Sequence, residues 1–176
     1  MPRSRPTTDQ DRFGALLDAH PGIVCKVAAT YCRHPEDRRD LVQEITAQLW
    51  RAFPRFDASR SFSTWAYRIA LNVAISHVRS MSLRRATLES YDEHDLDPID
   101  VRTSAPDASD RVRALYRVID SLAVFDRALL LLHLEGYRNT EIGDILGLSA
   151  TNVSTKLTRL RSQLRTQLTS DTPTHS

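Results

Sequence analysis

The chain has 176 residues, with 24 basic and 22 acidic side chains and a net charge of +2. Its apolar share of 41% is ordinary for a globular protein, and its length allows one mid-sized domain or two small ones. No apolar run approaches the roughly 20 residues of a membrane-spanning helix. The polar N-terminus lacks the apolar core of a signal peptide. These features argue against membrane insertion and predict a cytoplasmic protein.

The charges are unevenly distributed along the chain. Residues 1–85 carry 14 basic and 8 acidic side chains. Residues 86–110 carry one basic and eight acidic side chains, and residues 111–176 carry 9 basic and 6 acidic side chains. Two basic blocks therefore flank an acidic bridge that has two prolines and no helical periodicity. We interpret residues 86–110 as a linker between two domains, 9–85 and 111–168, because structureless loops of this length are uncommon inside one domain. A surface loop of a single domain is the alternative.

Apolar residues recur at helical spacing before the linker, which predicts four helices. Pro21 and Gly22 separate the first helix from the second, Pro35 begins the third, Pro54 ends it, and Ser61 or Ser63 caps the fourth, which runs to about Ser80. The third helix shows a polar face with Asp40, Gln43, Glu44 and Arg51. That face is either solvated or a protein-binding surface. With few glycines and few alternating runs, the sequence predicts an all-α fold.

Six of the 12 aromatic side chains lie within 18 residues, at Trp50, Phe53, Phe56, Phe62, Trp65 and Tyr67. Arginines are interleaved with them. Rings stack on unpaired bases while guanidinium groups hold the backbone, so this combination is typical of single-strand binding. We expect Phe53 and Phe62 to fill a core. We expect Trp65 and Tyr67, which share a helix with Arg68 and Asn72, to contact bases.

Helical periodicity returns at residue 111 and predicts helices over residues 111–122, 125–134, 141–146 and 150–168. Residues 139–160 fit a helix-turn-helix. Asn139 and Thr140 would cap its first helix, Gly143 is small at the crossing, Gly147 allows a left-handed turn and Ser149 caps the second helix. The outward face of that second helix is free of acids and fits a major groove: Asn152, Ser154, Thr155, Lys156, Thr158, Arg159 and Arg161. A plain solvated hairpin is the alternative.

Two groups of motifs carry a family resemblance. The first comprises Asp40-Leu-Val-Gln-Glu44, Leu49-Trp50-Arg51 and FSTWAYRIALN at residues 62–72. The second runs from Asp126-Arg127 through EGY at 135–137 and LGLS at 146–149 to Arg161. They resemble regions 2 and 4 of the sigma-70 family, in its small extracytoplasmic-function (ECF) members. The resemblance covers about residues 10–85 and 110–168. It departs at Ser76, where members usually have Asp, and at Leu122-Ala123, where Leu-Pro is usual.

The resemblance implies roles for the matching residues. The third helix, with Asp40, Gln43, Glu44, Trp50 and Arg51, would dock on core RNA polymerase, whose beta-prime and beta subunits are the expected partners. Phe56, Arg60, Trp65, Tyr67, Arg68, Asn72 and Arg79 would capture unpaired minus-10 DNA. The seven residues on the acid-free face of the last helix would read the minus-35 duplex of promoter DNA. The acidic linker would pass through the polymerase, and an anti-sigma factor is a further expected partner.

Catalytic and metal chemistry have little support in the sequence. His20, Cys25, Cys32 and His34 match no common zinc spacing. There is no glycine-rich phosphate loop, and nothing would hold the linker acids in a catalytic geometry. We therefore expect that the protein is not an enzyme and that it binds no cofactor and no metal. A promoter-specificity subunit is the leading hypothesis. A conventional helix-turn-helix regulator and a helical enzyme with an accessory DNA-binding domain are the alternatives.

Overall fold

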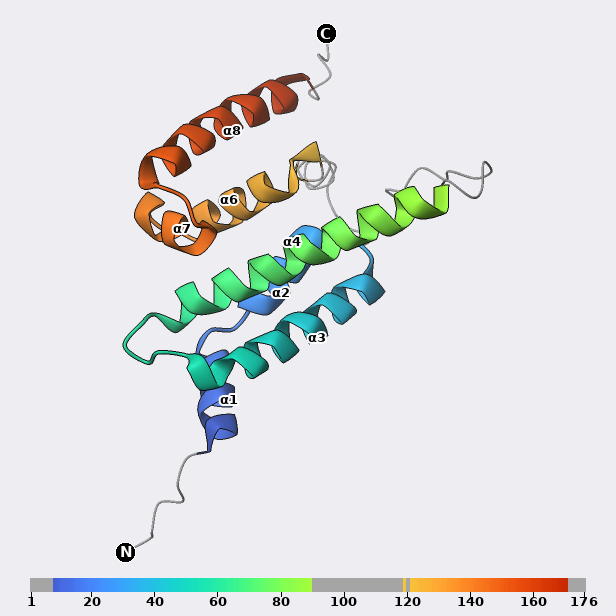
Figure 1. Cartoon of the computed structure of the whole chain (residues 1–176). Coiled ribbons are helices and arrows are strands. Elements are labelled where there is room, and N and C mark those ends of the chain that lie inside the picture. Colours follow the sequence, from blue (N-terminus) through green and yellow to red (C-terminus); the bar gives the residue numbers. More distant parts are fainter. Residues whose placement is uncertain (1–7, 90–118, 120, 171–176) are drawn as a thin grey trace, which may run out of the picture. The chain divides into compact units, whose positions relative to one another are not determined.

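The computed structural model describes residues 8–89, 119 and 121–170, and every regular element in these ranges is a helix (Figure 1). This confirms the all-α class for the described part of the chain. The chain divides into two compact units, Met1–Ser76 and His77–Ser176. Most of the predicted linker and most of the helix predicted over residues 111–122 lie outside the described residues. No described helix is both long and apolar enough to cross a bilayer.

The first unit is a helical assembly built on α3. Its elements are α1 (Asp9–Ala19), α2 (Ile23–Tyr31), α3 (Pro35–Ala52), the short 3-10 helix η1 (Phe53–Arg55) and the start of α4 (Phe62–Glu89). Thr8 caps α1, because its hydroxyl accepts the Asp11 N–H at 3.2 Å while the Asp11 carboxylate accepts the Thr8 N–H at 3.0 Å. One face of α3 carries a stripe of fully buried side chains, Leu41, Ile45 and Leu49, which belong to the core of this unit.

Helix α4 is longer than predicted. The sequence predicts an end near Ser80, but the helix continues to Glu89, so the first residues of the predicted linker are helical. Residues 61–97 contain no glycine or proline, so nothing in the local sequence stops the helix near Ser80. Its buried stripe ends at Ile75, since the described side chains from Ser76 to Arg84 are half-buried or exposed. The two compact units divide at the end of this stripe, between Ser76 and His77.

The second unit contains α6 (Val124–Leu134), α7 (Asn139–Leu146) and α8 (Ala150–Ser170), which pack on one another (Figure 1). Helix α7 begins two residues earlier than predicted, and Asn139 and Thr140 lie inside it. Its N-terminus is stabilised instead by Glu141, whose carboxylate accepts the Arg138 N–H at 2.8 Å. The predicted cap of α8 is confirmed, because the Asn152 N–H donates to Ser149 Oγ at 3.2 Å.

The turn between α7 and α8 depends on two glycines, as the sequence predicts. Gly147 has φ of +71°, the left-handed conformation that glycine adopts without steric cost. Gly143 is buried, and a Cβ at this position would lie 2.5 Å from the Leu148 carbonyl oxygen. The Leu148 N–H donates to the Gly143 carbonyl at 2.9 Å, which fixes this close approach of the two backbones. The helix-turn-helix geometry is therefore present.

Candidate nucleic-acid interface

Helix α8 separates a buried stripe from a polar face. Val153, Leu157 and Leu160 are at most 4% exposed and anchor the helix on its unit. The seven residues predicted to read duplex DNA are all exposed: Asn152, Ser154, Thr155, Lys156, Thr158, Arg159 and Arg161. No acidic residue occurs between Ala150 and Ser170. The structure therefore brings these residues together on one continuous, positively charged surface, with polar groups suited to phosphates and base edges.

Several of these side chains already have intramolecular contacts. The hydroxyl groups of Thr155 and Thr158 donate to carbonyl oxygens one turn earlier, both at 3.0 Å. Lys156 Nζ lies 5.8 Å from the centroid of the Phe125 ring, and Arg161 Nη2 lies 2.8 Å from His133 Nε2. The sequence alone does not point to Phe125 or His133, because both contacts join helices whose relative placement it does not show.

A second polar surface follows one side of α4. Trp65 is half-buried, and Arg68, Asn72 and Ser76 are exposed at the three- and four-residue spacing of one helical face. Arg79 is exposed farther along the same helix. The helix begins where Ser61 Oγ accepts the Thr64 N–H at 3.4 Å. The stripe places a ring beside guanidinium and amide groups, which is the combination predicted for unpaired DNA.

The aromatic side chains of the first unit form one connected cluster. Phe53 and Phe62 are 4% and 5% exposed, which confirms that they belong to the core. Half-buried Phe56 packs against Trp65 with ring centroids 4.9 Å apart and against Phe62 at 5.6 Å. Trp65 also contacts Phe62 at 5.4 Å. Phe56 and Trp65 therefore lie at the edge of the core, with part of each ring available at the surface.

Tyr67 corrects a sequence-based prediction. The sequence predicts that this residue contacts bases, but in the structure it is 2% exposed and faces the core. The reason is helical position: Tyr67 lies on the same buried stripe of α4 as Ala70, Leu71 and Ala74. A base could reach its ring only if the core opened. Tyr67 is therefore removed from the predicted DNA surface.

The loop before α4 carries Arg60, which is exposed and lies 3.6 Å from the Asp57 carboxylate. Asp57 also accepts the Ser59 N–H at 2.9 Å. The hydrogen bonds from Ser59, and to a smaller extent the charge of Arg60, lower the pKa of Asp57. Asp57 thus stays ionised near neutral pH. Its carbonyl oxygen also accepts the Arg60 N–H at 3.0 Å, so the loop forms a local turn from Asp57 to Arg60.

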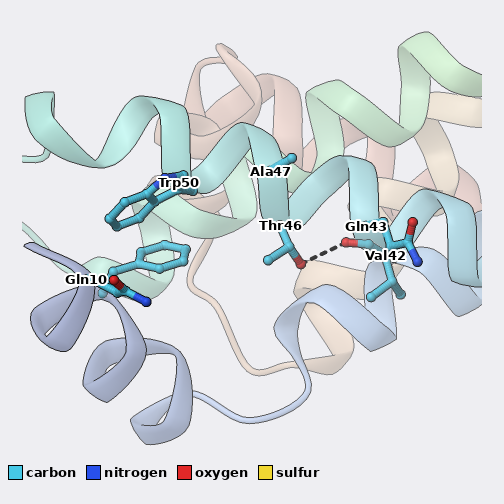
Figure 2. Close-up of a pocket in the computed structure, with 7 residues that line it drawn as sticks. Gln10, Val42, Gln43, Thr46, Ala47 and Trp50 are labelled. Atoms are coloured by element: carbon cyan, nitrogen blue, oxygen red, sulfur yellow. Dashed lines mark hydrogen bonds between the residues drawn. The ribbon is translucent and has the colours of Figure 1, made fainter.

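Helix α3 presents the residues predicted to bind a protein. Asp40, Gln43, Glu44 and Arg51 are exposed, and Trp50 is 43% exposed. An apolar pocket of about 610 Å³ lies between α1 and α3 and is lined by Gln10, Phe13, Val42, Gln43, Thr46, Ala47 and Trp50 (Figure 2). Figure 2 shows Gln10 on the α1 side opposite Trp50 on α3. The α1 residues of this pocket carry no signal in the sequence, because only the packing of α1 on α3 brings them to this surface.

The structure also bears on the residues considered for metal chemistry. Among the described residues, no group of three or more His, Cys, Asp or Glu side chains has the geometry of a metal site. Cys25 is exposed and Cys32 is buried, and burial raises the pKa of the Cys32 thiol. Cys32 is thus a small apolar core residue.

Comparison with known proteins matches both units. The family model for sigma-70 region 2 matches residues 16–84, and that for sigma-70 region 4 matches residues 112–164. CnrH, an RNA polymerase sigma factor of Cupriavidus metallidurans, is 28% identical over 93% of this chain and 90% of its own length. The ECF sigma factor SigW of Bacillus subtilis is 25% identical over 91% of this chain and 90% of its own length. RfaY of Xanthomonas campestris, a probable sigma factor, is 27% identical over 90% of this chain, which spans 41% of RfaY.

A solved structure shares the fold. The sigma factor RpoE of Bartonella quintana, in complex with the anti-sigma factor NepR, aligns with a TM-score of 0.67 and 17% identity, over 93% of this chain and 98% of RpoE. The match of the sigma-70 region 2 and region 4 models to the two helical units defines a transcription initiation factor. The chain belongs to the sigma-70 family and to its ECF group, whose members direct RNA polymerase to initiate at specific promoters.

Proposed function

We propose that this sigma factor divides its work among three surfaces: α3 binds core RNA polymerase, α4 holds unpaired minus-10 DNA, and α8 reads the minus-35 duplex. The observation that carries the proposal is the order of the two matches. A region 2 match on the first unit precedes a region 4 match on the second, and each covers the surface to which the role is given. Binding free energy drives every step, so the chain itself performs no covalent chemistry.

The polymerase-binding surface consists of Asp40, Gln43, Glu44, Trp50 and Arg51, with the apolar pocket at its edge. Gln43 and Trp50 belong to both the predicted surface and the pocket. A partner helix with charged groups beside an apolar side chain would fit such a surface, since the pocket removes that side chain from water. The partner is core RNA polymerase, through its beta-prime and beta subunits.

The single-strand surface combines Phe56, Arg60, Trp65, Arg68, Asn72 and Arg79. A base that stacks on the accessible parts of Phe56 and Trp65 gains roughly 1–3 kcal/mol. Two or three such contacts would hold a melted segment open, because unstacking a base costs a few kcal/mol. The exposed arginines supply the charge that follows the phosphate backbone, and Asn72 offers an amide to a base edge.

The duplex surface is the polar face of α8, with Asn152, Ser154, Thr155, Lys156, Thr158, Arg159 and Arg161. In helix-turn-helix proteins the second helix enters the major groove, and here that helix is held at its N-terminus by the Gly147 turn and the Ser149 cap. An arginine such as Arg159 can pair with both guanine acceptors, and hydroxyl groups suit either partner of a base pair.

We further propose an anti-sigma factor as a partner and the cytoplasm as the location. The first follows from RpoE, which was solved with the anti-sigma factor NepR. The second follows from the partner polymerase. The conventional helix-turn-helix regulator gains no support, because such a protein has no need of the region 2 match on residues 16–84.

Run-off transcription tests the proposal. Core RNA polymerase is incubated with fragmented genomic DNA of the source organism, with and without the purified chain, and the transcripts are mapped. We expect discrete start sites that depend on the chain. Identical transcripts in both reactions, on every fragment, would contradict the proposed function. A fragment set transcribed with the organism's own primary sigma factor serves as the control for core activity.

A further inference from the structure

We propose that Phe125 and His133 of α6 are positioning residues that hold Lys156 and Arg161 of α8 as two phosphate contacts on either side of the base-reading face. This inference rests on the proposed minus-35 role of α8 and divides its residues into two groups. The two held cations set the affinity for any duplex, whereas the residues between them set the preference for one sequence.

The placement of the two cations follows from helix geometry. An α-helix turns by about 100° per residue, so Lys156 and Arg161 are about 140° apart around the helix axis. Buried Val153, Leu157 and Leu160 lie inside that sector, so the two cations flank the buried stripe on opposite sides. The remaining sector, about 220° wide, carries the other exposed residues of the reading face, including Thr155 and Arg159.

Both cations are held by α6, which packs on α8 (Figure 1). At one edge, Lys156 Nζ lies 5.8 Å from the centroid of the Phe125 ring, within the range of a cation–π contact. At the other, Arg161 Nη2 donates to His133 Nε2 at 2.8 Å, since a guanidinium has donors only. The contacts come from the first and last turns of α6. Each reduces the conformational freedom that a long side chain would otherwise lose on binding DNA.

The edges of a helix in the major groove approach the two phosphate backbones, while its centre faces the base edges. An arginine carries five N–H donors and a lysine three, so one contact to α6 fixes the group and leaves donors for a phosphate. Phosphate contacts position a protein without reading sequence. The structure thus assigns a sequence-independent role to Lys156 and Arg161 and leaves discrimination to the exposed residues between them, which include Arg159.

The test uses the full chain with core RNA polymerase. Wild-type holoenzyme first selects its preferred upstream element from a duplex library randomised in that segment. Binding is then measured across salt concentrations on the selected duplex and on one with a scrambled upstream element. The variants are Lys156→Ala, Arg161→Ala and Arg159→Ala, with Phe125→Leu and His133→Leu for the positioning residues. Phe125→Tyr and His133→Gln are matched controls, because they keep a ring and an acceptor.

We expect Lys156→Ala and Arg161→Ala each to weaken binding to both duplexes by the same factor, roughly fivefold, and to lower the salt slope by about one. Arg159→Ala should lower the preference between the duplexes. His133→Leu should weaken both equally, His133→Gln should restore binding, and His133→Leu should add nothing to Arg161→Ala. The same holds for the other pair. Phe125→Leu should weaken binding to both duplexes equally, Phe125→Tyr should restore it, and Phe125→Leu should add nothing to Lys156→Ala.

Several outcomes would overturn the inference. The double variants combine His133→Leu with Arg161→Ala and Phe125→Leu with Lys156→Ala. Losses that add fully in them would show that α6 does not act through the two cations. A different loss on the two duplexes would make Lys156 or Arg161 a base reader. Failure of His133→Gln to restore binding would reduce His133 to a core-filling role. If wild-type holoenzyme selects no upstream element, the minus-35 role itself fails. If wild-type holoenzyme instead prefers the selected duplex and the losses in the double variants add fully, only the positioning role of α6 is overturned.

Discussion

The two units use their side chains in different ways. In the first unit, aromatic rings form the core and the edge of the proposed DNA surface within one contact network: Phe62 is 5% exposed, and Trp65, 5.4 Å away, is half-buried. In the second unit, the apolar stripe and the polar face lie on different sides of α8. Residue type therefore predicts the role of a side chain in α8, whereas in the first unit the position on the helix decides it.

The largest effect should come from the turn of the second unit. Gly143→Ala places a Cβ 2.5 Å from the Leu148 carbonyl oxygen, a backbone atom that cannot move away without breaking the turn. We expect a loss of about 1–3 kcal/mol in the free energy of unfolding. In the first unit, Gly14→Ala meets no atom within 4 Å and should stabilise α1 by up to about 1 kcal/mol. Thermal unfolding followed by circular dichroism measures both, and equal shifts would contradict the steric account.

The next effect concerns the polymerase-binding surface of the first unit. Gln43→Arg puts a charge at the rim of the apolar pocket, where a docked partner would exclude water. We expect the affinity for core RNA polymerase to fall by at least about tenfold, because an unpaired charge is costly to desolvate. Ala29→Arg, on an exposed position of α2 outside the pocket, is the matched control. Fluorescence-detected binding of core polymerase measures both, and equal affinities would remove the pocket from the interface.

A third test separates core from surface within the aromatic cluster. Trp65→Ala should lower promoter opening by roughly tenfold, because a stacking contact contributes roughly 1–3 kcal/mol. Tyr67→Phe keeps the buried ring and should leave opening unchanged. Permanganate reactivity of melted thymines reports opening, and binding to the closed duplex shows whether each variant is folded. If Tyr67→Phe impairs opening as strongly as Trp65→Ala, the assignment of Tyr67 to the core is wrong.

The smallest effect should come from the N-terminus of α7. Hydrogen bonds from the Arg138 side chain and backbone lower the pKa of Glu141. A lowered folded-state pKa contributes stability above the unfolded value of about 4.3, and this is lost as the pH falls through the folded pKa. Glu141→Gln should thus lower Tm slightly at pH 7, and this difference should shrink toward pH 3. Arg138→Ala, which retains the backbone donor, should have an intermediate effect. A pH-independent difference would contradict this linkage.

Much of the second unit could be predicted from the sequence. Gly143, Gly147 and Ser149 have local roles, since a close approach, a left-handed turn and a helix cap each require particular residue types. The helical spacing of the apolar residues also predicts correctly that Val153 and Leu157 face the core. The start of α7 was missed because the cap uses the Glu141 carboxylate and the backbone of Arg138, which is not a typical capping residue.

The first unit was less predictable because it depends on contacts between distant segments. The end of α3 near Pro54 and the start of α4 at Ser61, one of the two caps that the sequence offers, follow from local chemistry. The end of α4, which lies beyond the first unit, does not, since its last turns have no stop signal and no buried side chain among the described residues. The burial of Tyr67 depends on which face of α4 meets the core. The pocket between α1 and α3 depends on Phe13 and Gln10, which are remote in sequence from Trp50.

The central claim is that one chain makes two different DNA contacts on one promoter when it is bound to polymerase. Hydroxyl-radical footprinting and permanganate probing of the same holoenzyme–promoter complex test it directly. The account predicts backbone protection at an upstream duplex element together with reactive thymines downstream, and the loss of both when the chain is omitted. Protection of a palindromic site by the chain alone, without polymerase and without reactive thymines, would contradict it.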